Sequence, residues 1–259
     1  MNEQVATLRR AMDTIRPFQR GDIPEVLALY HEVFPIMERT ESGNLESYFE
    51  TAFFGSPLVD EDAGSLVYRD SSGNVLGFLG VQPRRLTIRG RTLRAAVCTK
   101  FMVSRRAGIN AAAVNMLRSI FHRPLDLILA DLANDPARRL WEGLGGRAVL
   151  LGSLYWSRAL RPVRSLVSRA GRVRLLKPLA LAARPFADIA DRVTTRLVPA
   201  LNHTSESLDP DTLIASLPVV CRERSLRPDY DARSLKWLLE LMTAANPTKT
   251  LRKRLVRNA

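Results

Sequence analysis

Two arginines and a glycine between an apolar segment and an alanine-rich segment are the residues best suited to bind an anion. Arg105, Arg106 and Gly108 follow the apolar run 95–103 and precede a helix-forming run that begins near Ile109. The first backbone N–H groups of a helix have no partner inside it, and the helix dipole adds partial positive charge there. These features predict a site for phosphate or pyrophosphate. The alternative is an ordinary strand–helix connection with its arginines in water, because a single glycine turn is a weak motif.

The segments around this turn predict alternating strands and helices. Expected strands cover 14–18, 65–70, 75–88, 92–103 and 125–131, with closing strands at 148–151 and 154–157, and expected helices cover 22–34, 45–54, 109–121 and 136–144. Segments 92–103 and 125–131 are joined by a helix, which predicts that they run parallel. This order predicts an α/β fold with a mixed sheet.

Local signals add detail to this expectation. Asp22 and Glu25 are spaced as in a capping box at the start of the first helix. Gly77 and Gly80 inside a strand predict a bulge or the close approach of another segment. The continuous apolar run 125–131 is typical of a central strand covered on both faces.

Composition limits the function classes. The chain has 259 residues, a net charge of +13 and two cysteines, Cys98 and Cys221, far apart in the sequence. This spacing supports neither a disulfide framework nor a zinc site. The high positive charge is typical of a protein that meets nucleic acid, an anionic membrane or a polyanionic cofactor, or of a basic solvated surface.

The positive charge is concentrated in residues 158–200, which contain ten Lys and Arg residues and two Asp residues. Interleaved leucine, valine and alanine predict one or two basic amphipathic helices, with breaks near Pro178 and Pro185. Such helices could form a linker packed on the sheet, lie on an anionic membrane surface, or contact nucleic acid. The few aromatic residues in the segment argue against base stacking.

Four segments, in this order, resemble the GNAT N-acetyltransferase superfamily. Residues 15–30 resemble its opening strand and helix, 73–80 its central hairpin, 101–117 its acyl-CoA-binding motif, and 134–146 its asparagine-led helix that ends at a glycine pair. The resemblance covers about residues 14–158. It implies an α/β (α+β) fold with a mixed, mostly antiparallel sheet flanked by helices, followed by a basic helical C-terminal extension.

The resemblance implies three parts of the chain: a GNAT-like acyltransferase domain at 14–158, a basic helical linker at 159–207, and a third segment at 208–259. This third segment contains a helix and an edge strand. It resembles the opening of a second GNAT-like module that ends early, and a C-terminal tail on the first domain is the alternative.

The resemblance also implies a site for acyl-CoA between two parallel strands that separate from one another. Met102 and Val103 would offer backbone groups to the pantetheine arm, and Asn134 would reach the same arm. The residues that would wrap the pyrophosphate are Arg105, Arg106, Ala107, Gly108, Ile109, Asn110 and Ala111. A backbone amide of the first of the two strands would polarise the thioester carbonyl. No metal is implied.

Two residues depart from the family pattern. Asn110 stands where the family usually has a small residue beside the phosphate, and Trp141 stands where it often has a tyrosine that protonates the leaving thiolate. An indole N–H is no useful acid, so the sequence leaves the catalytic residues unassigned. Residues that could accept or supply a proton are His31, Glu32, Glu41, Asp131 and Tyr155.

The function implied by the resemblance is transfer of an acyl group from acyl-CoA, such as acetyl-CoA, to an amine of a small molecule or amino sugar. The alternative is a catalytically inactive GNAT-like module that binds a membrane surface or a partner. The first residues lack the pattern of a signal peptide, and no apolar run reaches 18 residues. The expected compartment is the cytoplasm, and contact of 158–200 with the inner face of the membrane stays open.

Overall fold

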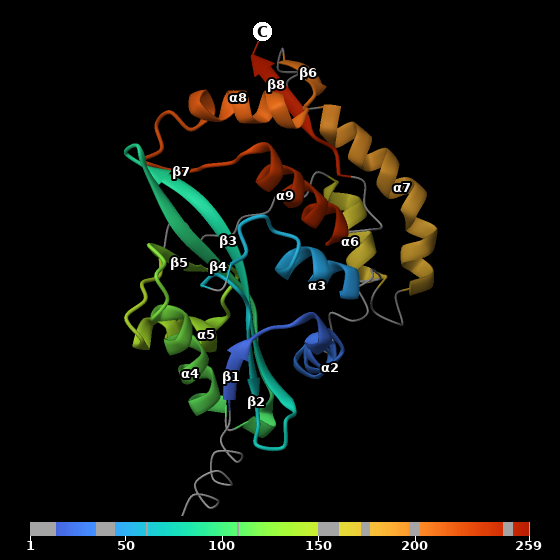
Figure 1. The fold of residues 1–259 in the computed structure, drawn as a ribbon. Coiled ribbons are helices and arrows are strands. Elements are labelled where there is room, and N and C mark those ends of the chain that lie inside the picture. Colours follow the sequence, from blue (N-terminus) through green and yellow to red (C-terminus); the bar gives the residue numbers. More distant parts are fainter. Residues whose placement is uncertain are drawn as a thin grey trace, which may run out of the picture. The chain divides into compact units, whose positions relative to one another are not determined.

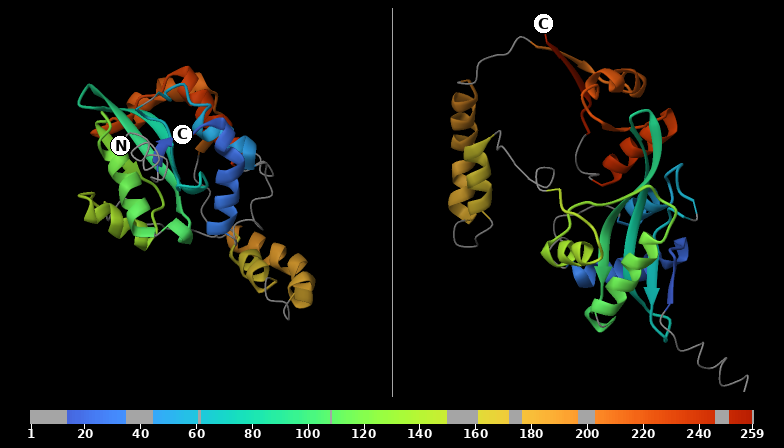
Figure 2. Two further views of the ribbon diagram at one scale, coloured as in Figure 1. Left: turned by 60° about the horizontal axis from the view of Figure 1, so that its bottom comes forward. Right: turned by 90° about the vertical axis from the view of Figure 1, so that its left-hand side faces the viewer.

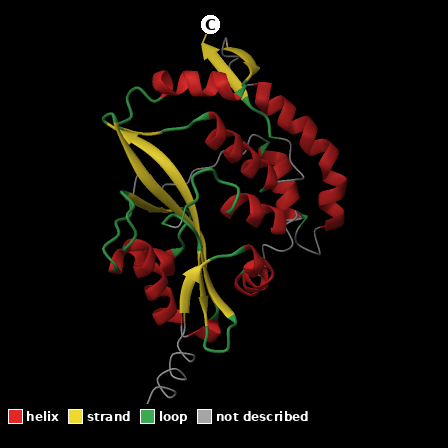
Figure 3. Cartoon of the chain, in the orientation of Figure 1, coloured by secondary structure: helices red, strands yellow, loops and turns green. Residues whose placement is uncertain are grey.

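The computed structural model describes residues 14–34, 45–60, 62–107, 109–149, 161–171, 177–196, 203–245 and 251–258. The chain divides into two compact units. The first contains residues 1–147 and 207–254, and the second contains residues 148–206 and 255–259. Figures 1 and 3 show the elements of both units.

A six-stranded sheet forms the centre of the first unit. Its order is β1 (Thr14–Pro17), β2 (Leu66–Arg69), β3 (Val75–Ile88), β4 (Arg91–Val103) and β5 (Leu127–Ala130), and β7 (Leu226–Pro228) pairs with the far end of β3. Among the described strands of this sheet, only the pair β4–β5 is parallel. The predicted α/β fold with a mixed, mostly antiparallel sheet is confirmed.

Helices cover both faces of this sheet (Figure 1). They are α2 (Ile23–Val33), α3 (Leu45–Phe53), α4 (Ile109–Phe121), α5 (Asp135–Gly143) and α9 (Ala232–Ala244), and α8 (Pro210–Val220) packs against α9. Phe78 packs in a cluster with Tyr30 of α2 and Phe49 of α3. Its neighbour Leu79 packs in a second cluster with Met116 of α4. Successive strand residues point to opposite faces, so the sheet separates two hydrophobic cores.

The two glycines of β3 lie where another segment approaches closely, as the sequence predicts. A Cβ atom on Gly80 would lie 2.6 Å from Cε1 of Phe53 and 2.8 Å from the carbonyl oxygen of Thr99. A Cβ atom on Gly77 would lie 2.8 Å from Sδ of Met116. A larger residue is therefore excluded sterically at Gly80, where backbone lies in the way, and at Gly77 it would require the Met116 side chain to move.

Asp22 occupies the N-cap position of α2, but the predicted capping box with Glu25 is wrong. The Asp22 carboxylate accepts hydrogen bonds from the backbone N–H of Gln19 and from Arg16 and Arg69, and makes no cap bond to α2. Glu25 pairs with Arg69 instead. Two arginines compete successfully for these carboxylates because charge-assisted hydrogen bonds are stronger than bonds to a neutral amide.

The prediction that 125–131 is a central strand covered on both faces is also wrong. Strand β5 spans four residues, and among the described residues it pairs with β4 alone. Leu129 and Ala130 are exposed, so the faces of the sheet are not fully covered at β5. The predicted strand 148–151 is described only at 148–149, which lie in no strand, and 154–157 lies outside the described residues.

Residues 207–254 belong to the same compact unit as residues 1–147. Trp237 of α9 is buried in the core around Phe49, and its indole N–H donates a hydrogen bond of 2.7 Å to the carbonyl oxygen of Thr51. The Arg84 guanidinium stacks 4.7 Å from the centre of the Trp237 ring, and Arg85 forms an ion pair of 2.6 Å with Asp231. Trp237 and Leu241 of this C-terminal segment thus pack in the first core.

In the second unit, α6 (Pro162–Ala170) and α7 (Lys177–Arg196) form a helical hairpin, seen from two sides in Figure 2. Pro178 lies in the first turn of α7, where a missing N–H leaves no helical bond unmade. The predicted break at Pro185 is wrong, because α7 continues through this residue. Strands β6 (His203–Ser207) and β8 (Arg254–Asn258) pair in a separate two-stranded sheet. Within the described ranges, no helix combines the length and the apolar character needed to cross a bilayer.

Candidate functional site

Strand β4 contains a β-bulge close to the predicted anion site. Met102 pairs with Phe78 and Thr99 pairs with Gly80, so Lys100 and Phe101 together lie opposite the single residue between them on β3. Lys100 has φ 49°, a left-handed conformation that is uncommon for residues other than glycine. An extra residue in one strand bends that strand and increases its twist, so β4 changes direction at Lys100.

The parallel ladder between β4 and β5 stops just before this bulge. It runs from Ala95 opposite Leu127 to Cys98 opposite Ala130. Strand β4 continues to Val103, whereas β5 ends at Ala130. The two strands are therefore not paired over the whole length of β4, and its last residues have no partner strand on the β5 side among the described residues.

The bulge also determines which backbone groups of β4 point towards the β5 side, away from β3. The N–H of Ser104 donates a hydrogen bond of 2.8 Å to the carbonyl oxygen of Leu76 at the start of β3. Because backbone groups alternate along a strand, those of Met102 also point towards β3, and those of Phe101 and Val103 point away from it. Of the two residues expected to offer backbone groups, Val103 thus faces the unpaired side.

A short 3-10 helix, η3 (Arg105–Ala107), joins β4 to α4. The N–H of Ala107 donates to the carbonyl oxygen of Ser104, and the buried Ser104 hydroxyl donates a hydrogen bond of 2.7 Å to the carboxylate of Glu32 on α2. The same carboxylate forms an ion pair of 3.1 Å with Arg106. Arg105 is exposed beside this pair. The side chains of both predicted anion-binding arginines are exposed, and Arg106 pairs with a carboxylate.

The turn leads into the N-terminus of α4, a helix of 13 residues. Gly108 lies outside the described residues, as do the side chains of Ile109 and Asn110. Ala111 in the first turn is exposed. Because the first N–H groups of a helix have no internal acceptor, this end of α4 presents backbone donors next to Arg105.

Asn134 and Trp141 have local structural roles on α5. Asn134 is the N-cap, and its side-chain oxygen accepts a hydrogen bond of 3.0 Å from the N–H of Ala137. The ring of Trp141 packs edge-on against Phe121 of α4, with ring centres 5.1 Å apart. The position that resembles a proton-donating tyrosine is therefore filled by a ring that joins two helices.

Of the other proton-transfer candidates, those that the structure describes are His31 and Glu32 on α2 and Asp131 after β5. Glu32 is engaged by Ser104 and Arg106, and the backbone N–H of Asp131 donates to the carbonyl oxygen of Cys98 at the end of the β4–β5 ladder. Glu41 and Tyr155 lie outside the described residues. Burial raises the pKa of the Cys98 thiol to about 12, which excludes a thiolate nucleophile there near neutral pH. In the described ranges, no group of three or more His, Cys, Asp and Glu residues could hold a metal.

Sequence reasoning missed Lys100 as a site residue. Its ammonium lies 3.4 Å from the hydroxyl of Tyr30, 4.8 Å from the centre of the Tyr30 ring and 5.6 Å from that of Tyr48. Cation–π contacts of this kind stabilise a partly desolvated charge. A lysine inside the apolar run 95–103 was the only available signal, and a bulge cannot be located from one strand alone.

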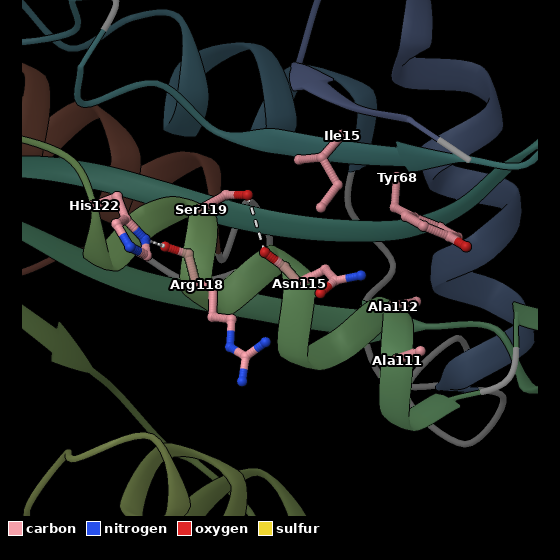
Figure 4. A pocket seen from close by; sticks show the side chains of 8 residues that line it. All are labelled: Ile15, Tyr68, Ala111, Ala112, Asn115, Arg118, Ser119 and His122. Atoms are coloured by element: carbon pink, nitrogen blue, oxygen red, sulfur yellow. Dashed lines mark hydrogen bonds between the residues drawn. The ribbon is translucent and has the colours of Figure 1, made fainter. Parts of the chain in front are cut away.

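A pocket of about 540 Å³ lies between α4 and strands β1 and β2 (Figure 4). It is lined by Ile15 and Tyr68 from the strands, by Asn115 and Ser119 from α4, and by His122 just after α4. Of the predicted site residues, only Ala111 contributes to it. The pocket and the unpaired end of β4 are therefore different places.

No known family model matches the chain, and no curated protein matches it in sequence. Solved structures that are similar to it include three N-acetyltransferases. An aminoglycoside N-acetyltransferase in complex with CoA has 12% identity and a TM-score of 0.43, covering 57% of this chain and 95% of that chain. A ribosomal-protein-alanine N-acetyltransferase from Brucella melitensis has 20% identity and a TM-score of 0.41, covering 57% and 100%. A glucosamine-6-phosphate N-acetyltransferase from Arabidopsis thaliana has 14% identity and a TM-score of 0.42, covering 57% and 98%.

Proposed function

We propose that the chain is an acyl-CoA-dependent N-acyltransferase of the GNAT type, acting on an amine of a small molecule such as an amino sugar. One observation supports this proposal above the others. The β4–β5 ladder stops before the bulge at Lys100, so that within the described residues Val103 has no strand partner on the β5 side, and it lies close to a helix N-terminus that is preceded by the exposed Arg105. A single ligand with an amide-containing arm and a pyrophosphate would match both features.

The residues present fit such a donor in part. The N–H and C=O groups of Phe101 and Val103 would bind the pantetheine arm as a further strand binds a sheet edge. Arg105 and the first N–H groups of α4 would hold the pyrophosphate, together with the backbone from Ala107 to Ala111. Arg106 would join them on leaving Glu32, and Asn134 would contribute its amide N–H₂, since its oxygen caps α5.

Acyl-CoA would supply an activated acyl group with a thiolate as leaving group. The uncharged amine of the acceptor would attack the thioester carbonyl carbon, so that a C–N bond forms and the C–S bond breaks. The amine loses one proton and the thiolate gains one. A backbone N–H of β4 aimed at the carbonyl oxygen would stabilise the negative charge that develops on it.

The proposed compartment is the cytoplasm. Cys98 and Cys221 are both free, which is the usual state of cysteines in a reducing compartment. The composition and cysteine usage require no oxidising environment.

Donor binding is tested by the thermal unfolding of the full chain with acetyl-CoA, CoA and dephospho-CoA at up to millimolar concentration. We expect the unfolding temperature to rise with each, because a ligand that binds only the folded state stabilises it. Arg105→Glu should weaken binding about tenfold or more, by loss of a charge-assisted hydrogen bond. Arg222→Glu, the same charge change at an exposed residue after α8, should leave binding unchanged. Gly108→Trp should abolish the shift, and no shift with acetyl-CoA would reject the proposal.

A catalytically inactive GNAT-like module is the second candidate. The identity of residue 141 favours this candidate. The family often has a proton-donating tyrosine at this position, and here Trp141 packs on Phe121 instead. Release of the CoA thiol in the presence of a panel of amines separates the two candidates. Acetyl-CoA binding with thiol release for at least one amine supports the enzyme, and binding without release for any amine supports the inactive module.

A further inference from the structure

One side of α7 carries a stripe of large apolar side chains, formed by Leu179, Phe186, Ile189 and Val193. Between 58% and 73% of the surface of each is exposed. Their spacings of seven, three and four residues place them on one side of a helix with 3.6 residues per turn. We call these four residues the α7 stripe.

The α7 stripe is not the side of α7 that packs on α6. Ala180 and Ala187 are buried, and Asp191, at the same angular position, reaches the first turn of α6. A Cβ atom on Gly171, at the end of α6, would lie 3.3 Å from Cβ of Ala180. The hairpin therefore buries the small side of α7 and leaves the side with the large apolar residues exposed. Single exposed apolar residues are normal, but a continuous stripe of four marks a binding surface.

Both carboxylates of the hairpin are used inside it. Asp191 accepts hydrogen bonds of 2.9 and 3.0 Å from the N–H groups of Val163 and Arg164, which caps α6. Asp188 forms an ion pair of 2.9 Å with Arg164. The other charged residues that the structure describes in the hairpin are basic, and those with exposed side chains are Arg161, Arg164, Arg169, Lys177, Arg184 and Arg192. The described hairpin therefore has more basic than acidic residues, and Lys177 and Arg184 lie on the side of α7 opposite to the α7 stripe.

We propose that the α6–α7 hairpin binds the surface of an anionic lipid bilayer, with the α7 stripe in the boundary between headgroups and acyl chains. An amphipathic helix with an apolar side and a basic remainder has the chemistry for this position. Each arginine near an anionic surface adds attraction. A second copy of the chain would bring equal positive charges together, and a nucleic acid would leave Leu179, Ile189 and Val193 of the stripe without an apolar partner.

The test is co-sedimentation of the full chain with vesicles of phosphatidylcholine alone or mixed with phosphatidylglycerol. Binding should require phosphatidylglycerol and decrease as salt is raised, because salt screens the attraction. Phe186→Ser should weaken binding about tenfold, since a large apolar side chain is lost from the lipid boundary. Phe186→Leu should retain most of it. Val219→Ser, a similar change at an exposed residue of α8, should have no effect. Arg184→Gln should weaken binding about fivefold.

Three outcomes would overturn the proposal. The first is no binding to vesicles that contain phosphatidylglycerol, or equal binding to phosphatidylcholine alone. The second is equal binding of Phe186→Ser and the unchanged chain. The third is a fall in the unfolding temperature without vesicles for Phe186→Ser but not for Phe186→Leu, which would show that the stripe is covered within the chain or by a second copy. None of these measurements involves acyl-CoA, so they are independent of the proposed enzyme.

Discussion

The carboxylate of Glu32 on α2 accepts a hydrogen bond of 2.7 Å from the hydroxyl of Ser104, which is fully buried at the end of β4. Glu32 also pairs with Arg106. Helix α2 on one side of the sheet is therefore bonded to the turn from which α4 begins on the other side. This bond fixes the turn that would hold a pyrophosphate and occupies one of its two arginines.

We expect Ser104→Ala to lower the free energy of unfolding by about 1–2 kcal/mol, because the buried turn loses the hydroxyl that joins Glu32 to the N–H of Arg106. Ser119→Ala is the matched control. Its hydroxyl donates only to the carbonyl oxygen of Asn115 in its own helix, so its loss should change little. Urea unfolding compares the two, and equal effects would show that the bond to Glu32 does not stabilise the turn.

The conformation of Lys100 predicts a difference between two substitutions that both remove its ammonium. Asparagine tolerates positive φ and a β-branched residue does not. With φ 49° at this position, Lys100→Val should therefore be less stable than Lys100→Asn by about 1–2 kcal/mol. Urea unfolding of the two variants measures this difference. If valine equals or exceeds asparagine in stability, β4 does not keep its bulge at this residue.

Asp22 makes stability depend on pH in the acid range. Burial would raise the pKa of its carboxyl, but hydrogen bonds from Arg16, Arg69 and the N–H of Gln19 outweigh burial and lower the pKa from 3.8 to about 2. A lowered folded-state pKa gives stability that is present above the unfolded value and is lost as pH falls through the folded value. This shift corresponds to about 2 kcal/mol.

The advantage of the unchanged chain over Asp22→Asn should therefore be constant from about pH 7 to 5 and shrink by about 2 kcal/mol towards pH 2. Urea unfolding at stepped pH measures it. Arg16→Gln removes a donor that makes hydrogen bonds of 2.6 and 2.8 Å to Asp22, so it should reduce the same pH-dependent part. A difference between the chain and Asp22→Asn that does not change between pH 5 and 2 contradicts the prediction.

Trp237→Ala should destabilise the first core by about 3–5 kcal/mol, the usual cost of truncating a buried aromatic residue. Trp237→Phe keeps a ring in the core but leaves the carbonyl oxygen of Thr51 without its indole donor, so it should cost less. Hydrogen exchange of the amides in α3 and β3 is the deciding measurement, and we expect it to become faster in Trp237→Ala. If residues 208–254 formed a module of their own, Trp237→Ala would leave the exchange of α3 unchanged.

The sequence by itself determined the order of strands and helices from residue 14 to residue 144. These elements follow from local signals: apolar residues at a period of two or 3.6, a cap such as Asn134, and a stop at Gly145 with φ 96°. The anion-binding character of Arg105 and the α4 N-terminus is local in the same way, because it depends on consecutive residues.

Only the tertiary structure decided where β4 bulges, which partner holds each arginine and what covers the core. The bulge at Lys100 depends on the register of two strands, and neither strand encodes it alone. Glu32 and Ser104 are 72 residues apart, and Trp237 and Thr51 are 186 apart. Periodicity and capping act over a few residues, whereas these contacts are chosen by how distant side chains pack once the sheet has formed, which a single sequence does not specify.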